Sequence, residues 1–306
     1  MTPSASATTD APGPFDPEPL FRAYRAGLKR VLRASRFGRP FRFCGEVTST
    51  NDLALEWARS GAPEGTLVVA SSQTKGRGRA GRTWVSGPGA GLWLSLVLRP
   101  DLACPSAGLL PVALGFGVVA ALRDLGLASD LKWPNDVLWR GRKLAGLLVE
   151  SQSRGDRVVL AVAGIGLNWT PPDLGGDSGR ATGMVEAFAG NAPPPETVLI
   201  RVLDHVEKVY FLLKAAGPGP FVKAWPGVSA GLGRRGETAL AERLLPDGSL
   251  EVLLTGGRRE RMVSGEGNKL PRRVVLRAET RGEGHPGMAP ALSPVPGRLV
   301  DDQNIV

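Results

Sequence analysis

A chain of 306 residues can hold one large domain or two smaller ones, and 42% hydrophobic with 22% charged residues is a globular composition. The formal net charge of +9 favours an anionic partner, but the basic residues are spread along the chain and do not single out DNA. Two cysteines without metal-ligand spacing and only two histidines argue against a Cys/His zinc site.

No stretch of the chain has the pattern of a targeting or membrane-spanning segment. Residues 1–18 are rich in Ser, Thr, Ala and Pro, which predicts disorder, and they lack the apolar core of a signal peptide. Residues 19–36 predict a helix whose basic face is solvated, with contact to an acidic partner as the alternative. The apolar run 107–122 is short for a membrane span and predicts a buried helix. We therefore expect a cytoplasmic protein without membrane association.

The first predicted strand leads into a polar helix start. Residues 41–47 read as a short strand, and a helix is expected from about Thr48 to Arg59. Ser49 with Asp52 resembles a capping box, which would give these polar side chains a structural role. The alternative is hydrogen bonding to a polar ligand at the N-terminus of the helix.

A basic, glycine-rich loop follows the predicted strand 65–72. Four cations stand among three glycines within eight residues: Lys75, Arg77, Arg79 and Arg82. Glycine lets backbone N–H groups approach an anion, and the guanidinium fork matches phosphate or carboxylate oxygens. The spacing also satisfies the dinucleotide motif G-x-G-x-x-G, but no helix can follow it here, so we reject that interpretation. A solvated loop without a ligand is the plain alternative.

Polar residues recur at defined points of the strands that come next. Strand 92–98 and a buried helix over 105–125 precede the segment LKWPNDVLW, a hairpin turn at 140–142, and strands 143–150 and 157–168. Residues 171–192 read as a loop, followed by helices over 195–216 and 221–225. Brief strands at 237–245, 250–255 and 261–264 predict a small β-barrel-like domain, and the end of the chain reads as a tail.

The inventory of polar groups favours one kind of chemistry. The two histidines lie far from any Ser or Cys elbow, which argues against a serine hydrolase, and the motif G-x-x-x-x-G-K-[ST] is absent, which argues against a P-loop NTPase. Arg, Lys, amides and one well-placed Asp suit a reaction limited by charge repulsion, such as a carboxylate attacking the α-phosphate of ATP.

Five motifs together resemble the biotin–protein ligases. They are Ser49-Thr50-Asn51, Gln73 with GRGRAGRTW at 76–84, LKWPNDV at 131–137, GRKLAGLLVE at 141–150 and GIGLN at 164–168. The resemblance runs from about Ser49 to Asn168 and continues weakly to about Leu270. It implies that biotin reacts with ATP to give biotinyl-5′-AMP, and that a lysine of a biotin carboxyl carrier protein domain then displaces AMP.

The resemblance also implies a fold and a division into domains. The expected fold is α+β, a mixed sheet with flanking helices like that of the class II aminoacyl-tRNA synthetases, followed by a small SH3-like β-barrel. The expected boundaries are a disordered N-terminus at 1–18, a catalytic domain at 19–226, the barrel at 227–276 and a tail at 277–306.

The resemblance assigns roles to individual residues. Lys143 and Arg79 are the expected catalytic residues, at biotin's carboxylate and the phosphate. The expected biotin contacts are Ser49, Thr50, Asn51, Gln73, Arg77, Arg79, Lys143 and Gly146. The expected ATP contacts are Arg79, Arg82, Trp84, Lys132, Asn135 and Asn168. Asp136 is the expected Mg²⁺ ligand. From their residue types alone, Trp84 could equally pack in the core, Asn135 and Asp136 could form a turn, and Lys143 could be solvent-exposed.

Two alternatives stay open at this point. A lipoate or octanoyl transferase shares the expected fold, although GRGRAGRTW and KLAG argue against it. A biotin-sensing DNA-binding repressor would account for the charge of +9, but only 48 residues precede Ser49, too few for a winged helix–turn–helix. We therefore expect no sequence-specific DNA binding, and we leave a homodimer open.

Overall fold

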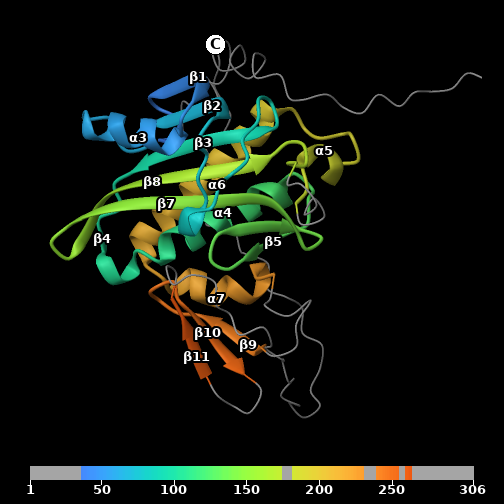
Figure 1. The fold of residues 1–306 in the computed structure, drawn as a ribbon. Coiled ribbons are helices and arrows are strands. Elements are labelled where there is room, and N and C mark those ends of the chain that lie inside the picture. Colours follow the sequence, from blue (N-terminus) through green and yellow to red (C-terminus); the bar gives the residue numbers. More distant parts are fainter. Residues whose placement is uncertain (1–35, 174–180, 231–238, 255–258, 264–306) are drawn as a thin grey trace, which may run out of the picture.

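A mixed β-sheet forms the centre of the protein (Figure 1). The computed structural model describes residues 36–173, 181–230, 239–254 and 259–263. Seven strands follow one another in the order β1-β2-β3-β8-β7-β6-β5, and β4 pairs with β8. Only β1 and β2 pair in parallel among the strands of this sheet. The bounds are Phe41–Val47 (β1), Leu67–Gln73 (β2), Gly91–Leu98 (β3), Leu102–Ala103 (β4), Ser129–Lys132 (β5), Asp136–Trp139 (β6), Arg142–Arg154 (β7) and Arg157–Asn168 (β8).

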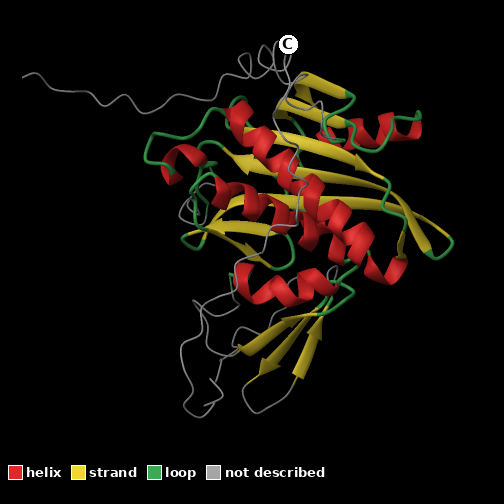
Figure 2. Ribbon diagram, turned by 180° about the vertical axis from the view of Figure 1, so that it is seen from behind, coloured by secondary structure: helices red, strands yellow, loops and turns green. Residues whose placement is uncertain are grey.

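Helices cover the two faces of this sheet unequally. Figure 2 shows the long helices α4 and α6 lying across one face, whereas α3 lies on the other face over β2, β3 and β8. A short helix, α7, lies between the sheet and the C-terminal strands. The helix bounds are Thr50–Arg59 (α3), Leu109–Asp124 (α4), Met184–Ala187 (α5), Pro195–Ala216 (α6) and Gly219–Val228 (α7), with 3₁₀ turns at Arg79–Gly81 and Cys104–Ser106.

Helix α4 is buried because it is apolar on nearly all sides. Its side chains pack into one core with α6 and the sheet, and Leu114, Val118 and Leu122 are fully buried. By length and composition alone Cys104–Asp124 could cross a membrane, but most of this segment is buried inside the protein. The predicted buried helix is therefore confirmed, since a helix that is hydrophobic all round is stable in a protein core.

Helix α3 packs through a narrower apolar face. Ala54 and Ala58 pack in one apolar cluster with Val68, Val97 and Val162. The polar N-terminus of the helix faces the middle of the sheet. The predicted helix is confirmed, but the capping box that Ser49 and Asp52 resemble, one of the two roles left open for them, does not form.

The N-cap position of α3 lies at Ser49. Its side chain makes no capping hydrogen bond. The Asp52 carboxylate binds Arg77 instead of the helix N-terminus, because the chain brings a guanidinium within 2.7 Å of it.

The C-terminal strands form a second, smaller sheet. Strands Ala239–Leu244 (β9), Leu250–Leu254 (β10) and Arg259–Met262 (β11) pair antiparallel in the order β11-β10-β9. Closure of this sheet into a barrel stays a prediction, because 231–238, 255–258 and everything from 264 onward lie outside the described residues.

Most predicted elements agree with the observed ones, with three differences. LKWPNDVLW forms two strands, β5 and β6, separated by a turn, and the expected loop 171–192 contains the short helix α5. The short helix expected over 221–225 extends over Gly219–Val228. The expectations for 1–18 and 277–306, and for 19–36 apart from its last residue, lie outside the described residues.

Candidate functional site

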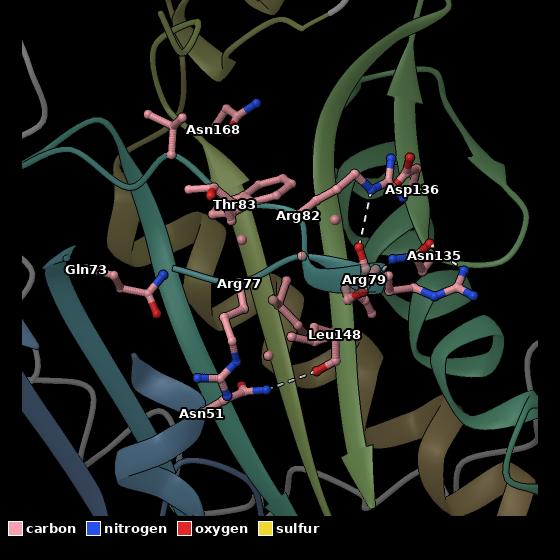
Figure 3. A pocket seen from close by; sticks show the side chains of 18 of the residues that line it. Asn51, Gln73, Arg77, Arg79, Arg82, Thr83, Asn135, Asp136, Leu148 and Asn168 are labelled. Atoms are coloured by element: carbon pink, nitrogen blue, oxygen red, sulfur yellow. Dashed lines mark hydrogen bonds between the residues drawn. The ribbon is translucent and has the colours of Figure 1, made fainter. Parts of the chain in front are cut away.

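Small residues on three neighbouring strands form the floor of the site. Gly146 of β7 pairs with Gly166 of β8, and Ser95 of β3 pairs with Gly164 of β8. Side chains alternate between the faces of a strand, so Gly164 and Gly166 present the same face, the one covered by α3. Because these positions carry little or no side chain, a cavity of about 210 Å³ lies above the sheet (Figure 3).

The cavity gathers almost all of the residues predicted from the sequence. Those that line it are Ser49, Thr50, Asn51, Gln73, Arg77, Arg79, Arg82, Trp84, Asn135, Asp136, Lys143, Gly146 and Asn168. Lys132, the remaining predicted residue, is exposed at the end of β5 and does not line the cavity. The site combines residues about 120 positions apart because the strand order places β8 between β3 and β7.

One end of the cavity is a neutral hydrogen-bonding network. Gln73 Oε1 accepts hydrogen bonds from the Thr50 backbone N–H at 2.8 Å and from the Thr50 hydroxyl at 3.1 Å. Gln73 Nε2 donates to Ser86 Oγ at 2.9 Å. The Ser95 hydroxyl donates to Asn51 Oδ1 at 2.6 Å, and Ser95 is fully buried. These groups are therefore held in fixed orientations, as recognition of a neutral polar ligand requires.

Arg77 connects the basic loop to both walls of this end. Its Nη1 lies 2.7 Å from Asp52 Oδ2 of α3, and its Nη2 lies 2.9 Å from Glu150 Oε2 of β7. The hydrogen bond to Asp52 raises the pKa of the Arg77 guanidinium above its ordinary value; burial opposes this, and the charge of Glu150 adds to it. Glu150 Oε2 also accepts a hydrogen bond from Asn51 Nδ2 at 2.6 Å. One carboxylate thus orients two residues that were predicted to bind ligand.

The other end of the cavity is cationic. Arg79 Nη1 donates to Asn135 Oδ1 at 3.3 Å, and Arg79 forms no ion pair with another described residue. Burial lowers the pKa of Arg79 from its ordinary value, an effect that Asp136 opposes. Arginine nevertheless stays protonated in proteins, so Arg79 presents a partly desolvated positive charge to the cavity. Such a charge favours an anionic ligand.

Lys143 and Asp136 form an ion pair beside Arg79. Lys143 Nζ lies 2.6 Å from Asp136 Oδ1, with both side chains only partly exposed. The same ammonium lies 4.8 Å from the centre of the Trp84 ring. Lys143 is therefore held in the cavity and not extended into solvent, although it lies two residues after a hairpin turn at Arg140 and Gly141, which both have positive φ.

Trp84 lies over the glycine floor. A Cβ on Gly166 would come within 2.6 Å of its Cε2, and one on Gly146 within 2.9 Å of its Cζ3. Its ring also meets Trp93 edge-to-face at 6.4 Å, and its indole nitrogen is buried without a hydrogen-bond partner in the described part of the chain. Both glycines are thus required for the indole to reach this position, and any larger residue would displace it.

Asn168 and Arg82 both line the cavity, but their side chains have different hydrogen-bond partners. The Asn168 amide donates to the backbone oxygens of Thr182 at 3.1 Å and Lys143 at 3.4 Å, so it joins the end of β8 to its neighbours. Arg82 is exposed, and its Nε donates to the Arg79 backbone oxygen at 3.2 Å.

The sequence interpretation gave no role to several residues that shape the site. Among them are Ser95, Glu150, Gly164 and Gly166, and the pairing of Asp52 with Arg77 was not predicted. The pattern G-I-G at 164–166 was a usable signal, because two glycines two residues apart leave one face of a strand without side chains. Ser95 and Glu150 offered no such signal, because a lone serine in an apolar strand and a glutamate at the start of a polar stretch do not reveal what faces them.

Comparison with known proteins identifies a matching family model, similar sequences and a similar solved structure. The model of the Biotin/lipoate A/B protein ligase family matches residues 44–168. The chain is similar to the bifunctional ligase/repressor BirA of Bacillus subtilis, with 35% identity over 212 residues, and spans 68% of its own length but only 64% of that protein. It is 37% identical over 195 residues, 60% of this chain, to the biotin--[acetyl-CoA-carboxylase] ligase of Paracoccus denitrificans, of which it spans 79%. The structure of the biotin protein ligase from Aquifex aeolicus in complex with biotin and ATP is similar with a TM-score of 0.61 and 29% identity, covering 74% of this chain and 97% of that one.

Proposed function

The chain belongs to the Biotin/lipoate A/B protein ligase family, and we propose that it activates biotin with ATP and transfers it to a carrier protein. The single observation that carries the proposal is the division of one cavity into a neutral and a cationic end. Thr50, Asn51 and Gln73 offer fixed neutral donors and acceptors, whereas Arg79 and Lys143 offer positive charge (Figure 3). Biotin has a neutral ureido ring at one end and a carboxylate at the other, which matches this division.

The first step joins two anions. An oxygen of biotin's carboxylate attacks the α-phosphorus of ATP, the bond to the β-phosphate oxygen breaks, and pyrophosphate leaves with that electron pair. Arg79 and Lys143 lower the barrier by neutralising charge where the two anions meet. Fixing both substrates over one glycine floor removes much of the entropic cost of the encounter.

The second step needs no nucleophile from this chain. The amine of a lysine on the carrier domain attacks the carbonyl carbon of biotinyl-5′-AMP, an amide bond forms, and AMP leaves with the electrons of the broken C–O bond. The carrier lysine loses a proton in the process. We propose that the acceptor is a biotin carboxyl carrier protein domain of a biotin-dependent carboxylase.

Magnesium is expected to enter with the nucleotide. Mg²⁺ in nucleotide sites is held by one or two carboxylates together with substrate phosphates and water. Asp136 supplies one carboxylate at the cationic end, while the described residues contain no cluster of three or more metal-ligating side chains. The donor set therefore fits a phosphate-bound ion and not a metal held by the protein alone. Bound there, Mg²⁺ would neutralise phosphate charge beside Asp136.

ATP is expected at the cationic end. Arg82, Trp84, Asn135 and Asn168 line the cavity around Arg79 and Lys143, which supports their assignment to the nucleotide. Lys132 is a weaker assignment because its side chain is exposed outside the cavity.

The domain boundaries and the barrel are also part of this proposal. We assign the catalytic domain to 19–226 and the small sheet to an SH3-like barrel over 227–276; the three antiparallel strands β9–β11 support the second assignment. A protein without sequence-specific DNA binding is the accompanying prediction. Operator binding with nanomolar affinity at physiological salt would contradict it, whereas weak, salt-sensitive binding would not.

Biotin-dependent exchange between ATP and pyrophosphate tests the proposal directly. Purified protein with Mg²⁺ and no carrier should catalyse exchange with biotin but not with lipoate. Exchange with lipoate alone would instead indicate a lipoate ligase, which the named relatives do not favour. Absence of exchange with either acid, in a folded sample, would refute the adenylation step.

A further inference from the structure

One side chain connects the cationic end of the cavity to the C-terminal sheet. Trp133 lies in the turn between β5 and β6, and its Nε1 donates a hydrogen bond to the Gly248 backbone oxygen at 2.9 Å. The indole is 9% exposed. Gly248 belongs to the turn between β9 and β10, 115 residues further along the chain. The contact therefore joins two parts of the protein that otherwise form separate sheets.

The acceptor of this hydrogen bond occupies a fixed position. Gly248 has a φ of +84°, and a Cβ there would lie 2.2 Å from the backbone atoms Gly108 C and Leu109 N. The turn thus packs directly on the backbone at the start of α4. Its own hydrogen bonds, from Leu245 N to Ser249 O at 2.8 Å and from Gly248 N to Leu245 O at 2.9 Å, hold its shape.

The donor belongs to a turn that delivers two residues to the cavity. Asn135 N donates to Lys132 O at 3.2 Å, which closes the turn around Trp133. Asn135 then accepts from Arg79, and the next residue, Asp136, forms the ion pair with Lys143. A shift of Trp133 would therefore be transmitted to Asn135 and Asp136, the partners of Arg79 and Lys143.

We propose that Trp133 is a positioning residue for the nucleotide end of the site, held in place by Gly248. The assignment rests on the proposed ligase function. Trp133 does not line the cavity, so it acts through Asn135 and Asp136 and not by contact with substrate. The neutral end, around Thr50 and Gln73, comes from α3 and β2, and in Figure 3 Gln73 lies across the pocket from Asn135 and Asp136. Loss of the Trp133 contact should therefore affect ATP and spare biotin.

The exchange assay on the full chain separates these effects. Trp133→Phe keeps an aromatic ring but removes the donor, and it should raise the KM for ATP roughly three- to tenfold, the size expected for one buried hydrogen bond. The KM for biotin should stay within about twofold of wild type. A purely structural role would lower the melting temperature and disturb both constants alike.

A pair of glycine substitutions supplies the matched control. Gly248→Ala forces the turn away from α4 and should reproduce the ATP effect. Gly155→Ala, in the hairpin between β7 and β8, strains a similar backbone with a φ of +61°, but its Cβ would meet nothing within 4 Å. It should leave both KM values unchanged. If Trp133 acts through Gly248, combining Trp133→Phe with Gly248→Ala should add little to Gly248→Ala alone.

The possible results are distinct. Wild-type protein without biotin-dependent exchange overturns the proposed function and this assignment with it. Active wild type with an unchanged ATP KM in Trp133→Phe, or with equal changes in both KM values, overturns the positioning role alone. Should Gly248→Ala fail to fold, Trp133→Phe against Gly155→Ala decides.

Discussion

Gly164→Ala tests whether the glycine floor sets the geometry of the neutral end. The added methyl group would lie 2.4 Å from Asn51 Oδ1, about 1 Å inside the 3.4 Å at which ordinary contact begins. Asn51 cannot simply rotate away, because Ser95, Leu148 and Glu150 all hold its amide by hydrogen bonds. The substitution should therefore displace Asn51 from its present orientation.

The size of the effect follows from the hydrogen bonds that must break. Asn51 would lose the Ser95 hydroxyl and the Glu150 carboxylate, each at 2.6 Å. A neutral hydrogen bond contributes roughly 0.5–1.5 kcal/mol and one to a charged group roughly 1.5–3 kcal/mol, so about 2–4.5 kcal/mol is lost. At about 1.4 kcal/mol per factor of ten, this corresponds to a fall of roughly 30- to 1,600-fold if all of it appears in kcat/KM for biotin.

Biotin-dependent pyrophosphate exchange, with thermal unfolding alongside, measures this effect. The kcat/KM for biotin should fall at least about tenfold, since part of the loss can appear as stability, while the KM for ATP stays near wild type. Gly45→Ala is the matched control, because Gly45 also lies in a strand of the main sheet and its Cβ would meet nothing within 4 Å. Equal kinetics for the two variants would refute the proposed role of the glycine floor.

Three further predictions concern charged residues. Lys143→Ala should reduce exchange by roughly 10²- to 10³-fold, as for loss of one electrostatic contact to a transition state, in a protein that unfolds at the wild-type temperature. Lys223→Ala, which replaces an exposed lysine of α7, should leave exchange unchanged. Turnover within a few-fold of wild type would exclude a catalytic role for Lys143. Glu150→Gln keeps an acceptor for Asn51 but removes the charge opposite Arg77, so the KM for biotin should rise roughly three- to thirtyfold; an unchanged value would show that the pair does not position the loop. Burial raises the pKa of Glu186, but hydrogen bonds with Arg142 and Thr182 outweigh this effect and lower the pKa below its ordinary value of 4.5. The ionised Glu186 therefore stabilises the folded protein above pH 4.5, and this stability is lost as the pH falls through the folded-state pKa. Urea unfolding of Glu186→Gln should accordingly show a smaller loss of stability than wild type between pH 6 and pH 3, and an equal loss would contradict the pKa shift.

Local sequence patterns were sufficient for most elements of the fold. The helix predicted over 195–216 has the same bounds as α6, and the strand predicted over 41–47 has the same bounds as β1. These elements are predictable because the spacing of apolar residues along a short segment determines which face can be buried. LKWPNDVLW was harder, because its apolar residues are interrupted by Lys132 and by the run Pro134–Asp136, and the segment folds into two strands.

The residue types of the site can be inferred from local sequence, because the five motifs place cations, amides and glycines in a recognisable order. Which of these residues touch depends on contacts between distant segments. Asn51 meets Gly164, Arg77 meets Glu150, and Trp133 meets Gly248, each pair separated by 73 to 115 residues. Such contacts depend on the insertion of β8 between β3 and β7 and on the seating of the C-terminal turn on α4. Local periodicity predicts neither of these two features, because each results from the burial of surfaces that lie far apart along the chain.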